Sequence, residues 1–143
     1  MAATRSRAIV LSAEDRSAIV EVVTRADTMA TQRDADGYAA VFTSDAVLEG
    51  SEGVHQGSES LRQDVGAIWS AEGVVSVHLT LNVDVAEVDG RTDQARATSV
   101  LVILGGDHAT EIRTVAFIEQ DLVRDERTWR IARRIVREAG EST

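Results

Sequence analysis

The sequence predicts an α+β fold, with helices in its first half packed on one face of a curved sheet built from its second half. Apolar residues recur at helical spacing up to Gly73 and at every second position after it. A length of 143 residues is enough for one domain with a real core. We therefore divide the chain into a loose basic N-terminal arm (1–11), a single domain (12–138) and a short tail (139–143).

The first helix is predicted over residues 13–33. Ser12 is a typical N-cap, and Glu14 and Asp15 place carboxylates in the first turn, where the helix dipole favours them. The remaining elements of this half are a short helix that carries Tyr38 and ends near Asp45, a strand over 46–49, a glycine-rich loop over 50–57 and a third helix from about Ser58.

Four antiparallel strands follow, each separated from the next by a turn rich in glycine or charged residues. They are predicted over 74–89, 93–105, 109–125 and 128–138. In the first strand His78 lies in a strictly alternating pattern, so that one face is apolar and the other is polar. The polar face contains Ser76, His78, Thr80, Asn82 and Asp84. Such a row is either a solvated sheet face or the lining of a cavity.

The composition excludes several classes of function. A net charge of −9 and a pI near 4.7 argue against nucleic acid and against an anionic membrane surface. The chain has no apolar run of about 20 residues and no secretory signal, which together with the absence of cysteine favours the cytoplasm. The three histidines lack metal-ligand spacing and no dinucleotide or phosphate motif is present, so we expect no metal and no cofactor.

Three segments in the same order resemble the SnoaL-like branch of the NTF2-like superfamily. The first runs from Arg33-Asp34 through Phe42 to Asp45-Ala46, the second is the His78-x-x-x-Asn82 strand, and the third is the Asp121 to Arg134 hairpin with Trp129. The resemblance covers roughly residues 12–138. It implies a cone, in which three N-terminal helices pack on a strongly curved, mainly antiparallel sheet around a blind apolar pocket. It also implies a homodimer formed through the outer face of the sheet.

The resemblance further implies roles for single residues. His78 matches the base of dehydratase-like members and Arg134 matches a pocket arginine. The position of the acid that partners the histidine falls on Thr31, which cannot supply charge, so the acid–base pair is expected to be incomplete. If the pocket face of the third strand carries Glu119 and Asp121, either could replace that acid. Asp121 is equally well explained as a structural partner of Arg124 or Arg134.

The remaining candidate residues each have a structural alternative. Substrate contacts are predicted for Thr31, Asn82, Trp69, Phe117, Glu119 and Tyr38. Asn82 could instead bond the backbone, and Trp69 and Phe117 could be core residues. His55 and His108 are expected in solvated loops, although the loop of His55 could rim the pocket mouth.

The predicted function is a cofactor-independent cyclisation or isomerisation of a small lipophilic, polyketide-type intermediate. His78 would act as an acid, a base or a hydrogen-bond donor, with Arg134 and Asp121 in catalytic roles. One alternative is a dehydratase or lyase that pairs His78 with Glu119 or Asp121. The other is a dimeric binding module without catalysis.

Overall fold

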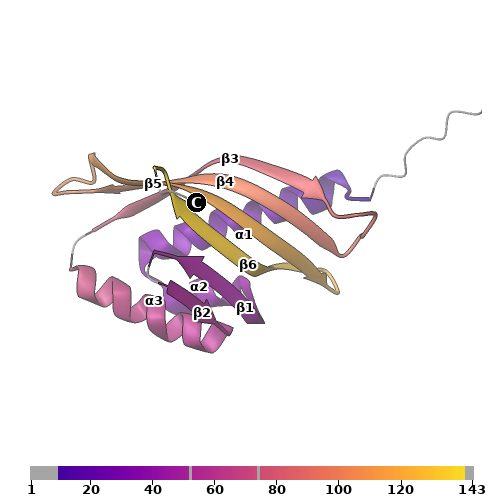
Figure 1. Cartoon of the computed structure of the whole chain (residues 1–143), viewed down its shortest axis with the longest axis horizontal. Helices are drawn as coiled ribbons and strands as arrows, with labels where there is room; N and C mark the ends of the chain where they lie inside the picture. Colours follow the sequence, from indigo (N-terminus) through magenta and orange to yellow (C-terminus); the bar gives the residue numbers. More distant parts are fainter. Residues whose placement is uncertain (1–9, 52, 74, 141–143) are drawn as a thin grey trace, which may run out of the picture.

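The computed structural model describes residues 10–51, 53–73 and 75–140, and their elements form a layer of helices against one sheet (Figure 1). In chain order the elements are α1 (Ala13–Gln32), α2 (Ala35–Ala40), β1 (Phe42–Gly50), β2 (Gly53–Gln56), α3 (Ser58–Glu72), β3 (Val77–Glu87), β4 (Gln94–Gly105), β5 (Glu111–Asp125) and β6 (Thr128–Glu138). Among these residues the strands lie in the order β2-β1-β6-β5-β4-β3, with only β1 and β6 parallel. The predicted α+β fold and its four-stranded meander are confirmed.

The differences from the prediction lie at the edge of the sheet. β1 begins at Phe42 rather than at residue 46, and β2 occupies the stretch predicted as a loop. Both follow from tertiary pairing, because β1 aligns with β6 and then folds back as a hairpin with β2. None of the helices in the described residues is both long and apolar enough to cross a lipid bilayer.

The ends of the domain are also tighter than predicted. Leu11 is 1% exposed within the core, so its assignment to a loose arm was wrong, while residues 1–9 lie outside the described residues. The backbone N–H of Ala139 donates to the carbonyl of Val115, which ties the first residue of the predicted tail to β5 just beyond the end of β6. Residues 141–143 also lie outside the described part.

The N-terminus of α1 is anchored to the β5–β6 hairpin. Ser12 and Asp15 form a reciprocal capping box, as the sequence predicts. The same Asp15 carboxylate accepts hydrogen bonds from Trp129 Nε1 and from Arg124, each at 3.2 Å. Because one carboxylate binds both the N-cap of α1 and two side chains of the β5–β6 hairpin, it fixes the start of α1 against that hairpin.

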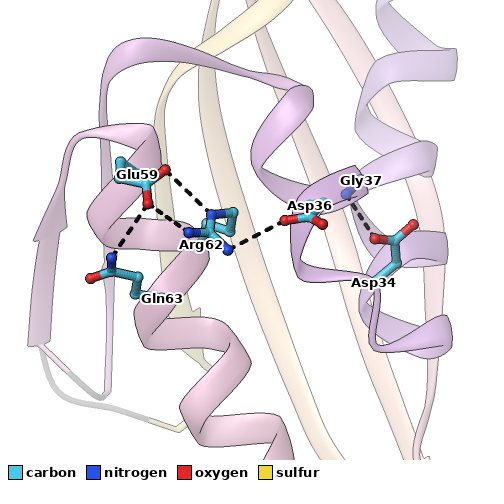
Figure 2. A network of polar contacts seen from close by, with 6 residues as sticks. All are labelled: Asp34, Asp36, Gly37, Glu59, Arg62 and Gln63. Atoms are coloured by element: carbon cyan, nitrogen blue, oxygen red, sulfur yellow. Dashed lines mark hydrogen bonds and ion pairs between the residues drawn. The ribbon is translucent and has the colours of Figure 1, made fainter.

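Helices α2 and α3 are joined by a polar network at the protein surface. Asp34 caps α2 by accepting from the N–H of Gly37, and Arg62 of α3 reaches both Asp36 and Glu59 (Figure 2). Gly37 leaves no room for a side chain, since a Cβ there would lie 2.4 Å from the sulfur of Met29. Glycine at this position therefore allows α2 to lie close to α1, and the next residue, Tyr38, is 6% exposed.

A bulge in β3 reverses which residues face the interior. Asn82 has a φ of 54°, and the pairing with β4 shifts between Leu81 and Asp84. Before the bulge His78 and Thr80 point inward, and after it the inward residue is Val83. The prediction of one uninterrupted polar face was therefore wrong beyond residue 81. The bulge also bends the sheet around α1.

The two faces of the sheet differ in their surroundings. The inner face packs under α1 with Ala97, Leu122 and Ile131 at 1% exposure or less. The outer face, which is turned toward the viewer in Figure 1, carries no helix in the described part of the chain. Exposed apolar side chains on this face lie near one end of the long strands and include Leu79, Leu81, Val115 and Phe117.

Candidate functional site

A cavity of about 200 Å³ lies between the helices and the inner face of the sheet. Its wall is mainly apolar and is formed by Ala30, Tyr38, Leu48, Val65, Ile68, Trp69, Leu101 and Val136. Five polar or charged side chains interrupt this wall, and they are Asp27, Ser51, His55, His78 and Arg134. An apolar hollow with a few convergent polar groups is the usual form of a small-molecule site.

His78 enters the cavity from β3, at one edge of the sheet. Its backbone N–H donates to Thr31 Oγ1 at 2.7 Å, which ties the start of β3 to α1. Its ring Nε2 lies 3.4 Å from Ser76 Oγ. Burial lowers the pKa of His78 below the usual 6.5, the carboxylate of Asp27 works in the opposite direction, and Arg134 lowers the pKa further. The ring is therefore neutral near pH 7 and able to accept a proton.

Asp27 and Arg134 form an ion pair beside His78. Both residues are 2% exposed, and Asp27 Oδ1 accepts from Arg134 at 2.5 Å while Oδ2 accepts from Thr80 at 2.5 Å. Arg134 also donates to Gln120 at 3.1 Å. Burial opposes the charge on Arg134, but the charge and hydrogen bond of Asp27, together with Tyr38, outweigh it and raise the pKa of Arg134. The guanidinium therefore stays charged inside the protein.

Tyr38 and Trp69 form an aromatic wall of the cavity. Their rings meet edge to face with centroids 5.4 Å apart. Burial raises the pKa of Tyr38, with Arg134 opposing and Asp27 adding to the shift. The phenol consequently remains protonated and can donate a hydrogen bond. The predictions that Tyr38 and Trp69 lie at the pocket agree with this placement.

Three predicted site residues lie on the outer face of the sheet, so their placement in the pocket was wrong. Phe117, Glu119 and Asp121 alternate with the buried Ile118 and Gln120, and a strand sends successive side chains to opposite faces. Phe117 is 57% exposed. The carboxylate of Asp121 pairs with Arg96 rather than with Arg124 or Arg134, and that of Glu119 pairs with Arg137. Neither carboxylate can serve as the acid for His78.

Two further residues have structural roles. Asn82 is exposed at the β3 bulge, where its left-handed backbone conformation is better tolerated by asparagine than by most residues. Thr31 uses its hydroxyl to hold the backbone of His78 and does not line the cavity. Of the predicted residues, the structure brings His78, Arg134, Tyr38 and Trp69 together.

The sequence reasoning missed Asp27 and undervalued His55. Asp27 lies one helical turn before Thr31, among Ile19, Val23 and Ala30 on the buried stripe of α1. A single carboxylate within an apolar stripe was the available signal, because such a group is stable there only with a partner of opposite charge. His55 belongs to β2 and lines the cavity directly, whereas His108 is exposed in the β4–β5 turn.

The comparison with protein families matches the SnoaL-like domain to residues 11–135. The chain belongs to the SnoaL-like family. This membership confirms the resemblance drawn from the three sequence segments. For this SnoaL-like chain, no curated protein sequence gives a match.

Solved structures share the fold of this SnoaL-like chain. A protein of unknown function with a cystatin-like fold from Nostoc punctiforme has a TM-score of 0.80 at 23% identity, covering 92% of this chain and 96% of that one. ActVI-ORFA from Streptomyces coelicolor has a TM-score of 0.76 at 17% identity, covering 88% and 98%. A candidate scytalone dehydratase from Novosphingobium aromaticivorans has a TM-score of 0.72 at 16% identity, covering 88% and 85%. At these identities the likeness establishes the fold.

Proposed function

We propose that this SnoaL-like protein catalyses proton transfer on a small lipophilic intermediate of the polyketide type, leading to cyclisation or isomerisation. The observation that carries the proposal is a neutral imidazole, His78, in an open apolar cavity beside a buried carboxylate, Asp27. Buried titratable groups with shifted pKa values in a cleft are typical of catalytic sites. The substrate class is the one expected from the resemblance to the SnoaL-like family, whose domain matches residues 11–135.

In the proposed step His78 removes a proton from a carbon next to a carbonyl group. The imidazolium that forms is stabilised by the charge of Asp27, whose carboxylate is held in place by Arg134 and Thr80. The phenol of Tyr38 is a hydrogen-bond donor for the enolate oxygen. The apolar wall folds a flexible substrate into a reactive shape and so lowers the entropic part of the barrier. The step as written requires no cofactor.

Dehydration is the second candidate function, and the same carboxylate favours it. A carboxylate beside His78 supplies the charge that the position of Thr31 cannot supply, and the second histidine of the cavity could assist the departure of a hydroxyl group. The likeness to a candidate scytalone dehydratase agrees with this alternative. Both reactions begin with proton removal by His78.

The volume of the cavity restricts the substrate. At about 200 Å³ it lies below the roughly 300–1,000 Å³ that is common for ligand pockets. We therefore expect a substrate with one or two rings in the cavity and any further rings at the mouth.

The test uses 2-tetralone, a two-ring ketone with acidic α-hydrogens, in deuterated water. Proton NMR follows the exchange of the α-hydrogens for deuterium. Wild-type protein should accelerate the exchange, and His78→Gln should lower the rate by about a hundredfold or more, because the base is lost. His108→Gln, which changes an exposed histidine, is the matched control and should equal wild type. If His78→Gln exchanges as fast as wild type, the proposal that His78 is the base fails.

We also propose that two copies of the chain associate through the outer face of the sheet. Leu81, Val100 and Phe117 are aligned across three neighbouring strands, and Leu79, Val102 and Val115 form a parallel row beside them. The charged side chains next to these rows are already paired with one another, as in Arg96–Asp121 and Glu119–Arg137. A partner of opposite charge is therefore not needed, while a second copy supplies matching apolar rows.

Light scattering coupled to gel filtration tests this association. Wild type should elute as a dimer. Phe117→Glu should give a monomer, because in each copy it places a charge in the row formed by Leu81, Val100 and Phe117. Arg91→Glu, which changes an exposed residue outside these rows, should leave the dimer intact. A monomeric wild-type protein would refute the proposed interface.

A further inference from the structure

A second histidine–carboxylate pair borders the same cavity. His55 of β2 lies with Nδ1 2.7 Å from Asp64 Oδ2 of α3, and the hydroxyl of Ser60 donates to the same carboxylate oxygen at 3.2 Å. The His55 side chain is only 17% exposed. With Nδ1 held by the carboxylate, Nε2 is the ring nitrogen that remains for a ligand.

The two imidazoles approach the cavity from opposite edges of the sheet. His55 belongs to β2 and His78 to β3, which are the first and last strands in the sheet order. Both residues nevertheless line one cavity, because the sheet curves around it. A ligand that occupies this cavity therefore has two imidazoles in the wall around it.

The environments of the two rings differ in a way that suits complementary tasks. His78 is desolvated and kept neutral, as a base requires. The ring of His55 is in contact with a carboxylate that balances its charge when it is protonated, and both of its nitrogens then carry hydrogen. In that state Nδ1–H donates to Asp64, and Nε2–H is the donor for the cavity.

We infer that His55, oriented by Asp64, is a second catalytic residue that protonates a substrate oxygen while His78 removes a carbon-bound proton. This inference rests on the function proposed above. In the enolisation of a ketone the α-C–H bond breaks and its proton passes to His78. The electron pair forms the C=C bond, the carbonyl π pair moves to oxygen, and that oxygen takes the Nε2 proton of His55. His78 ends as imidazolium and His55 as neutral imidazole. Solvent then takes the proton from His78 and supplies one to His55.

The experiment measures α-hydrogen exchange of 2-tetralone over a range of pH for wild type, His55→Gln, Asp64→Asn and His108→Gln. His55→Gln should lower kcat by about a hundredfold with little change in KM, because general acid catalysis is lost while the apolar cavity remains. The pH profile of kcat should also change, because one of the two groups that exchange protons with the substrate is removed. The other titratable groups in the cavity wall are Asp27, Tyr38, His78 and Arg134, and all four are unchanged in this variant.

Asp64→Asn preserves the size of the side chain but removes the carboxylate. As a positioning residue, Asp64 should affect kcat less than His55 does, and the variant should keep the KM of wild type.

The outcomes distinguish a failure of this inference from a failure of the proposed function. If wild type exchanges and His78→Gln does not, but His55→Gln keeps the wild-type kcat and pH profile with only a lower Tm, then His55 is a structural tie between β2 and α3 and this inference is overturned. If wild type neither binds nor exchanges 2-tetralone, the proposed function itself is overturned.

Discussion

Replacing Asp27 by asparagine should strongly destabilise the fold. The substitution keeps the shape of the side chain, and its amide oxygen can still accept from Arg134 while its NH₂ group faces the Thr80 hydroxyl. What is lost is the negative charge, which leaves the guanidinium of a residue that is 2% exposed without compensation. Breaking a buried ion pair in this way costs about 3 to 5 kcal/mol. For a chain of this length that corresponds to a fall in Tm of roughly 10 to 17 °C.

Urea denaturation followed by circular dichroism gives the free energy of unfolding for each variant. Glu49→Gln is the matched control, because Glu49 pairs with Arg133 on the neighbouring surface at 2.9 Å and should contribute at most about 1 kcal/mol. Adding Arg134→Leu to Asp27→Asn should recover part of the loss, since no buried charge then lacks a partner. If Asp27→Asn costs no more than Glu49→Gln, the reasoning about the buried pair is refuted.

Two further predictions concern residues around the cavity. The pKa of His78 is lower in the folded state than the usual 6.5, so the unfolded state binds more protons between the two values, and stability should fall as the pH drops below about 6.5. His78→Gln should remove that part of the pH dependence in urea titrations between pH 5 and 7, and an unchanged curve would contradict the burial of the ring. Thr31→Val should cost about 1 to 3 kcal/mol, because the N–H of His78 loses its acceptor. Thr28→Val, which changes an exposed threonine on the same helix, is its control.

Much of the fold could be predicted because its signals are local. The capping box at Ser12 and Asp15, the start of α3 at Ser58 and the four long strands all depend on residues close together in the chain. β2 could not be predicted in the same way, since four residues become a strand only when β1 is already placed beside β6. A hairpin at the edge of a sheet depends on pairing more than on its own composition.

To predict the residues of the candidate site, one must know which side chains of each strand point toward the cavity. His78 and Arg134 were identified through the family resemblance, and both line the cavity. Glu119 and Asp121 were placed on the wrong face, because alternation along β5 shows that they share a face without showing which face it is. Their outward direction follows from the burial of Leu122 in the core cluster that includes α1 and of Ile118 in a second cluster with Leu101 and Ala116.

Composition and periodicity were sufficient for the class of fold and the order of its elements, because hydrogen bonding and burial within each element follow from neighbouring residues. The partner of the buried arginine could not be found in this way. Asp27 and Arg134 are separated by 107 positions and meet only after the sheet has curved around α1. The same curvature brings His55 and His78, from the two edges of the sheet, to one cavity. The chemistry of the site therefore arises from contacts between distant segments, whose energies depend on burial that no local pattern encodes.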